Sequence, residues 1–236
     1  MTLWRREEKV PAKVETPPSN EGTVARLVQV LLDAGIDGLG PLKSAHEMAD
    51  AAKEHTRSTE AAVAKVARNH LAKGAVGGFV TGVGGFLTMP IALPANVVEF
   101  YVAATRMVAS IAELRGYDLD DPQVRTAVLL TLVGSDADEV LTRVGLTGGS
   151  GGRMVGLASQ QLPPAGLLML NKAIGFRILR GVGEKAFARF GRAVPLAGGV
   201  LGGGIDLWMM KRIADNAMNE FPPREPYPRV VRSSGH

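Results

Sequence analysis

Three polar residues, Asn96, Glu99 and Arg106, recur at helical spacing along a segment that is otherwise largely apolar. At 100° per residue they fall within an arc of about 100°, together with Ser110 and Glu113. An arginine on such a line could bind the phosphate of a ligand, because its guanidinium forms paired hydrogen bonds with phosphate oxygens. The structural alternative is an ion pair that fixes the helix register, or a solvated helix face.

A fourth polar residue, Asp206, stands in an apolar, glycine-rich segment nearer the carboxyl terminus. A buried carboxylate requires a partner or a shifted pKa, and Arg106 or another basic residue would meet that need. We call Asn96, Glu99, Arg106 and Asp206 the polar seam. It is the candidate lining of an apolar pocket for a small molecule or a lipid headgroup.

The remaining chemistry-bearing residues form no recognisable catalytic or metal site. The histidines lack the spacing of a zinc-binding helix, and the acidic clusters 118–121 and 135–139 lack that of a calcium loop. The chain has no cysteine, which removes thiol catalysis and sulfur-based zinc sites. We therefore predict no catalytic residue, no cofactor and no metal ion, and we favour a protein that is not an enzyme.

The segment 74–98 contains no charged residue, and its number of residues is large enough to cross a bilayer. Pro90 and Pro94 interrupt it, so it is typical of an apolar helical hairpin rather than of a membrane-spanning helix. Its glycines at spacing four predict a close approach of two helices, either in a membrane or in a soluble bundle. The candidate residues for membrane contact or tight packing are Gly74, Gly78, Gly82, Gly85, Phe86, Met89, Pro90 and Pro94.

The organisation of the chain is predicted to be one helical domain, 22–220, between two flexible tails. Residues 1–21 are charged and proline-containing, and residues 221–236 are proline-rich. Between them the apolar residues follow helical spacing, and no alternating strand pattern is evident. We predict an all-α fold, a compact multi-helix bundle with a glycine-rich apolar hairpin. Expected helix starts include Pro41, and Asp121 as a cap before Pro122.

The overall charge of the chain favours some partners over others. Its 236 residues carry a formal net charge of +4, which suits an anionic membrane surface but falls short of a nucleic-acid-binding patch. The amino terminus lacks the apolar core of a signal peptide. We therefore expect a cytoplasmic protein, with the inner face of the membrane as its expected surface, and no binding of nucleic acid.

A long central stretch resembles the signature of the EcsC family, and the likeness extends over about residues 40–220. The matching elements are the TGVGG motif of Thr81 to Gly85, Pro90 and Pro94, Arg106-Met107, Ile111 to Asp118, and Leu132 to Gly134. Where the family usually carries an amide, this chain has Asp206. The founding member is encoded beside an ABC transporter, so the resemblance implies membrane proximity and association with lipid. It implies no catalytic residue.

Three functional hypotheses follow from these observations. The first is a non-enzymatic, membrane-associated or lipid-interacting protein that is accessory to transport or envelope processes. The second is a soluble helical scaffold that acts through protein partners or as a homo-oligomer. The third is an enzyme or small-molecule binder with a pocket at the polar seam.

Overall fold

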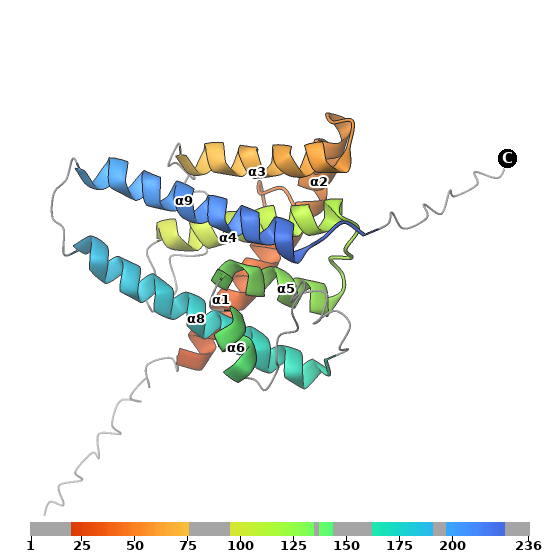
Figure 1. Cartoon of the computed structure of the whole chain (residues 1–236). Coiled ribbons are helices and arrows are strands. Elements are labelled where there is room, and N and C mark those ends of the chain that lie inside the picture. Colours follow the sequence, from red (N-terminus) through yellow and green to blue (C-terminus); the bar gives the residue numbers. More distant parts are fainter. Residues whose placement is uncertain (1–19, 76–94, 135–136, 144–161, 191–196, 225–236) are drawn as a thin grey trace, which may run out of the picture.

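A computed structural model describes residues 20–75, 95–134, 137–143, 162–190 and 197–224 of the chain (Figure 1). Every regular element in these ranges is a helix, so the predicted all-α fold is confirmed. The elements are α1 (Asn20–Leu32), the π turn η1 (Asp33–Asp37), α2 (Ala45–Glu54), α3 (Thr59–Ala75), α4 (Ala95–Leu114), α5 (Pro122–Val133), α6 (Ala137–Arg143), α8 (Pro164–Phe190) and α9 (Ala197–Glu220).

Local sequence signals determine where two of these helices begin. The Asp121 carboxylate accepts a hydrogen bond from the Gln123 backbone N–H at 2.8 Å, so Asp121 caps α5 with Pro122 at its first position, as predicted. The expected start of α2 at Pro41 is wrong. Ser44 and Glu47 form a reciprocal capping box at 3.1 and 2.8 Å, which starts the helix at Ala45.

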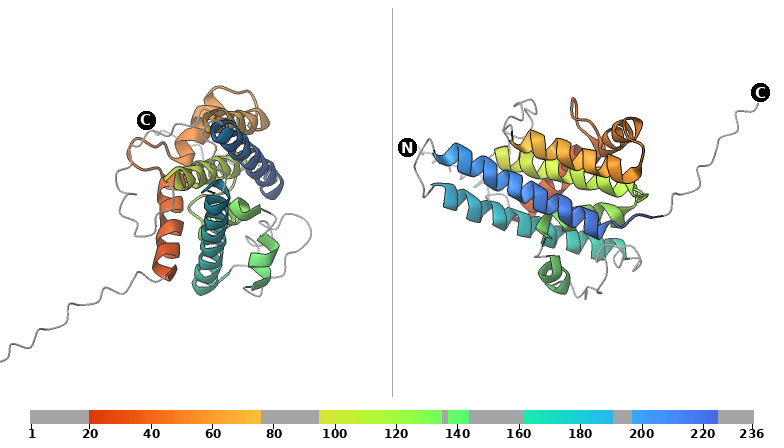
Figure 2. Two further views of the ribbon diagram at one scale, coloured as in Figure 1. Left: turned by 90° about the vertical axis from the view of Figure 1, so that its left-hand side faces the viewer. Right: turned by 45° about the horizontal axis from the view of Figure 1, so that its top comes forward.

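Helix α4 is the centre of the bundle. It packs against α2, α3, α5, α9 and η1, and each residue from Ala104 to Ala112 is buried. A second group of contacts joins α8 to α1, α5 and α6. The left view of Figure 2 shows that the long helices cross one another, with α8 vertical and α4 lying across it. Because α5 contacts both α4 and α8, it connects the two groups of helices.

Two glycines permit the closest helix approaches among the described residues. A Cβ atom added to Gly175 of α8 would lie 2.6 Å from Val24 Cγ1 and 2.9 Å from Val28 Cγ2 of α1. A Cβ atom added to Gly35 would lie 2.7 Å from the Thr105 side chain of α4. The glycines that the sequence singled out lie elsewhere. Gly74 is in the last turn of α3, and the other candidate residues of the predicted hairpin lie within 76–94, outside the described residues.

The carboxyl end of α9 is held by Arg115, the residue that follows α4. Its Nη1 donates to the carbonyls of Phe221, at 2.8 Å, and of Met218, and its Nη2 donates to Glu60 Oε2 at 2.9 Å. A guanidinium at this position satisfies carbonyls that have no partner within the helix and complements its dipole. We call this arrangement the Arg115 clasp.

The packed part of the chain extends beyond the predicted boundary at residue 220. Phe221 is fully buried, and its ring lies 5.0 Å from that of Tyr117 in an edge-on arrangement. The Arg224 backbone N–H donates to the Arg115 carbonyl at 3.0 Å. Pro222 and Pro223 follow directly after the helix and cannot continue it. Phe221 and Arg224 nevertheless contact the helical domain.

We expect Gly175→Ala to lower the free energy of unfolding by about 1–3 kcal/mol, because the added methyl group would overlap Val24 and Val28. Gly166→Ala, near the start of the same helix, is the matched control. Its added Cβ would meet no atom closer than 3.6 Å, so higher helix propensity should leave stability unchanged or raised by up to about 1 kcal/mol. Urea denaturation of the two variants measures both effects. Equal changes in the two would contradict the close α1–α8 approach.

We expect Arg115→Met to destabilise the protein by about 3 kcal/mol, because it removes charge-assisted hydrogen bonds to two carbonyls at the end of α9. Glu60→Gln tests the remaining contact alone. The Glu60 side chain is largely exposed, so its loss should cost less than about 1 kcal/mol. Thermal and urea unfolding compare the two variants, and a larger loss for Glu60→Gln would show that the clasp depends on the ion pair instead.

Candidate functional site

The polar seam does not assemble around Arg106 as an ion pair. Arg106 is only 6% exposed, and its Nη2 donates to the Ala34 carbonyl in η1 at 2.9 Å. The hydrogen bond that the structure shows for this guanidinium therefore goes to a main-chain oxygen and not to Glu99 or Asp206. Burial lowers the pKa of Arg106. The contact joins α4 to the π turn that ends the first helix.

The next polar residues along α4 also make structural links. Ser110 Oγ donates to the Ala45 carbonyl at 3.1 Å, at the start of α2. One turn further, Glu113 Oε1 lies 2.7 Å from Nδ1 of His46, also on α2. These contacts favour the structural interpretation of the line, since they connect neighbouring helices, and the Ser110 hydroxyl would otherwise be buried without a partner.

The other members of the polar seam are less enclosed. Glu99 is half-buried, and burial raises the pKa of its carboxyl. Asp206 is half-buried on α9. Asn96 lies in the first turn of α4, and its side chain is outside the described part of the structure. Asn96 and Glu99 lie on α4, and Asp206 lies on α9.

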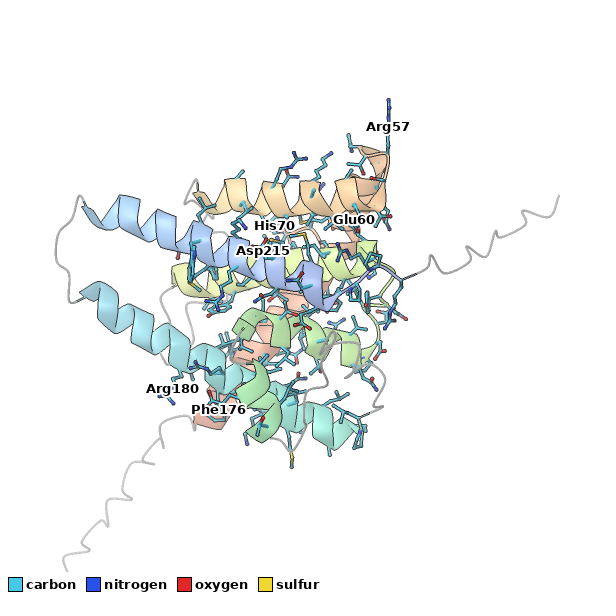
Figure 3. The ribbon with its side chains drawn as sticks, viewed as in Figure 1. Arg57, Glu60, His70, Phe176, Arg180 and Asp215 are labelled. Atoms are coloured by element: carbon cyan, nitrogen blue, oxygen red, sulfur yellow. The ribbon has the colours of Figure 1, made fainter. Side chains whose placement is uncertain are left out.

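One face of α8 carries exposed apolar residues, a feature that the sequence reasoning missed. Leu168 is 70% exposed, Met169 66% and Phe176 38%, while Leu170, Ile174 and Ile178 of the same helix are buried. Exposed Lys172 and Arg180 share this face. Figure 3 shows Phe176 and Arg180 projecting from α8 away from α4, α5 and α9. We call Leu168, Met169, Lys172, Phe176 and Arg180 the α8 face.

A faint signal of this face exists in the sequence. Leu168, Lys172, Phe176 and Arg180 repeat every fourth residue, which places them on one side of a helix. The opposite side of the helix is also apolar, so periodicity cannot indicate which side is buried. Only the packing of α1, α5 and α6 against α8 decides that question.

A second exposed apolar group lies on α9. Trp208 is exposed, with the Arg212 guanidinium 5.5 Å from the centre of its ring, and Leu207 is next to it. Lys211 Nζ lies 2.6 Å from Asp215 Oδ2 one turn further along. This group therefore mixes both signs of charge, unlike the α8 face.

No helix in the described ranges is both long and apolar enough to cross a membrane. The same ranges hold no group of three or more histidine, aspartate or glutamate side chains placed to bind a metal ion.

Comparisons with known proteins do not identify this chain. No family model matches it, and no curated protein and no solved structure shows significant similarity to it.

The half-buried position of Glu99 gives a pH-dependent prediction for Glu99→Gln. Because burial raises the pKa of this carboxyl from its ordinary 4.5, the folded state holds the proton more strongly than the unfolded chain. Well below pH 4.5 the residue is neutral in both states, and as pH rises through the folded pKa its ionisation opposes folding. A glutamine at this position cannot ionise, so the variant does not lose stability as pH rises. The gain in unfolding free energy from Glu99→Gln should therefore be larger at about pH 7 than at about pH 4. Equal gains in unfolding free energy at the two pH values, measured by urea denaturation, would contradict this prediction.

Proposed function

We propose that this protein is a non-enzymatic, membrane-associated helical protein that binds the lipid surface without crossing it. The observation that supports this proposal most is the α8 face. In a bundle whose other large apolar side chains are mostly buried, Leu168, Met169 and Phe176 lie together on one helix and remain exposed. Grouped apolar side chains of this kind are typical of sites that bind a partner or a membrane.

The energetics of this face suit reversible binding. Full burial of an aliphatic or aromatic side chain contributes about 1.5–3 kcal/mol, so three side chains that enter a lipid surface contribute several kcal/mol. Part of this gain offsets the loss of translational and rotational freedom on binding. A surface of this size therefore supports peripheral and reversible attachment rather than permanent anchoring.

The sequence supports the same proposal in two other ways. The uncharged segment 74–98 was predicted to form an apolar hairpin, and it would supply a second contact with lipid. The resemblance of Thr81 to Gly134 to the EcsC family implies membrane proximity, and we propose kinship with that family on those residues. A cytoplasmic location beside the inner face of the membrane is part of the proposal.

The second candidate function is a helical scaffold that acts through protein partners or self-association. The α9 group favours it, because an exposed Trp208 beside Arg212 is the combination enriched at the centres of protein interfaces. A small-molecule pocket at the polar seam is less well supported, because Arg106 donates to the Ala34 carbonyl.

Flotation on phospholipid vesicles tests the proposal, with Leu168→Ser as the critical variant. The wild-type protein should float with vesicles that contain anionic lipid, and Leu168→Ser should bind about tenfold more weakly because a mostly exposed leucine would no longer enter the lipid. Leu39→Ser is the matched control, since Leu39 is 46% exposed but lies on the turn after η1.

Three results would decide whether the α8 face binds lipid. Weaker flotation of Leu168→Ser alone supports the proposal. Equal loss in both leucine variants would show that any exposed leucine contributes, and would remove α8 as the contact. Wild-type protein that stays at the bottom of the gradient with every vesicle composition would overturn membrane binding and favour the scaffold.

A further inference from the structure

We propose that the α8 face recognises anionic phospholipid specifically, lying flat on the bilayer with Lys172 and Arg180 against lipid phosphates. This inference rests on the proposed membrane association through α8 and adds to it the chemistry of the lipid and the orientation of the helix.

The order of residues along the face suits a helix parallel to the membrane plane. Leu168, Lys172, Phe176 and Arg180 occupy successive turns, so apolar and basic side chains alternate along about 18 Å of helix. Exposed Met169 widens the apolar part at one end. In a helix at the interface, the apolar side chains enter the acyl boundary. The long basic side chains extend to the headgroups.

The charge of α8 is mainly positive. The helix contains Lys172, Arg177, Arg180, Lys185 and Arg189 and one acidic residue, Glu184, four residues after Arg180. The helices packed against α8 contribute exposed charges of both signs, Arg26 on α1 and Glu139 on α6. Helix α8 itself therefore sets the positive sign of the face. An anionic surface complements this sign, and each basic side chain close to such a surface strengthens binding.

The same features make a second copy of this chain a poorer occupant. In a twofold dimer the same patch appears on both subunits. A dimer built on the α8 face would bring the Lys172 and Arg180 side chains of one copy towards those of the other. Like charges at an interface oppose association, whereas lipid phosphates attract them.

The test compares two vesicle compositions and two charge-reversed variants by flotation at low salt. The compositions are phosphatidylcholine alone and phosphatidylcholine with phosphatidylglycerol. The variants are Lys172→Glu/Arg180→Glu on the α8 face and Arg57→Glu/Arg68→Glu as the control. Arg57 and Arg68 are exposed, and Figure 3 shows Arg57 at the opposite side of the molecule from Arg180. Each reversal changes the charge by two, so both double variants take the net charge from +4 to 0.

The expected result is specific to both lipid and variant. Wild-type protein should bind vesicles with phosphatidylglycerol at least about tenfold more strongly than phosphatidylcholine alone, and raised salt should weaken that binding. The α8 double variant should bind the anionic vesicles about thirtyfold or more weakly, because each lost basic residue accounts for about fivefold. The control should lose much less.

Other results would overturn the inference in distinguishable ways. Equal wild-type binding to both compositions would refute anionic recognition and leave membrane association intact. Equal loss in the two double variants would mean that net charge, and not the α8 face, attracts the lipid. No binding to either composition would refute the proposed function as well. Far-UV circular dichroism checks that both double variants fold. If the charge-reversed α8 variant does not fold, Lys172→Gln/Arg180→Gln takes its place and should also bind the anionic vesicles more weakly than the wild-type protein.

Discussion

The burial of α4 is the constraint on which the rest of the bundle depends. From Ala104 to Ala112 every residue is buried, so the polar side chains on this stretch cannot hydrogen-bond to bulk water. Each finds an oxygen of the main chain instead. Thr105 donates to the Tyr101 carbonyl within the helix, Arg106 to Ala34 and Ser110 to Ala45. The last two contacts fix where the first helix ends and where α2 begins relative to α4.

The Arg115 clasp extends the same principle to the end of the domain. A charged side chain that is almost fully buried is retained where several oxygens surround it. Here these are carbonyls at the end of α9 and a carboxylate at the start of α3. The clasp orders the residues after α9 and holds Phe221 against Tyr117. Helices α3, α4 and α9 therefore form one continuously packed group, whereas one side of α8 remains uncovered.

Local signals in the sequence predicted the class of the fold and several of its parts. Helical spacing predicted α4 over nearly its full length, and Asp121 and Pro122 predicted the start of α5. The start of α2 was misplaced because Pro41 is compatible with a first turn, and only the capping box at Ser44 identifies the true one. The sequence pattern identified Arg106 and Ser110 as polar positions, but their partners lie 72 and 65 residues away in the chain. No spacing within one helix specifies contacts at that separation.

The sequence by itself determined the basic charge and the apolar content of this protein, which are matters of composition. It also determined that the protein is helical, because helix formation depends on neighbours three and four positions away. The tertiary structure decided which apolar residues are buried. Helix α8 has apolar side chains on both sides, and the packing of α1, α5 and α6 against one side leaves Leu168, Met169 and Phe176 exposed on the other. It also decided the role of Arg106, since the oxygen that the guanidinium meets is brought to it only when η1 packs against α4.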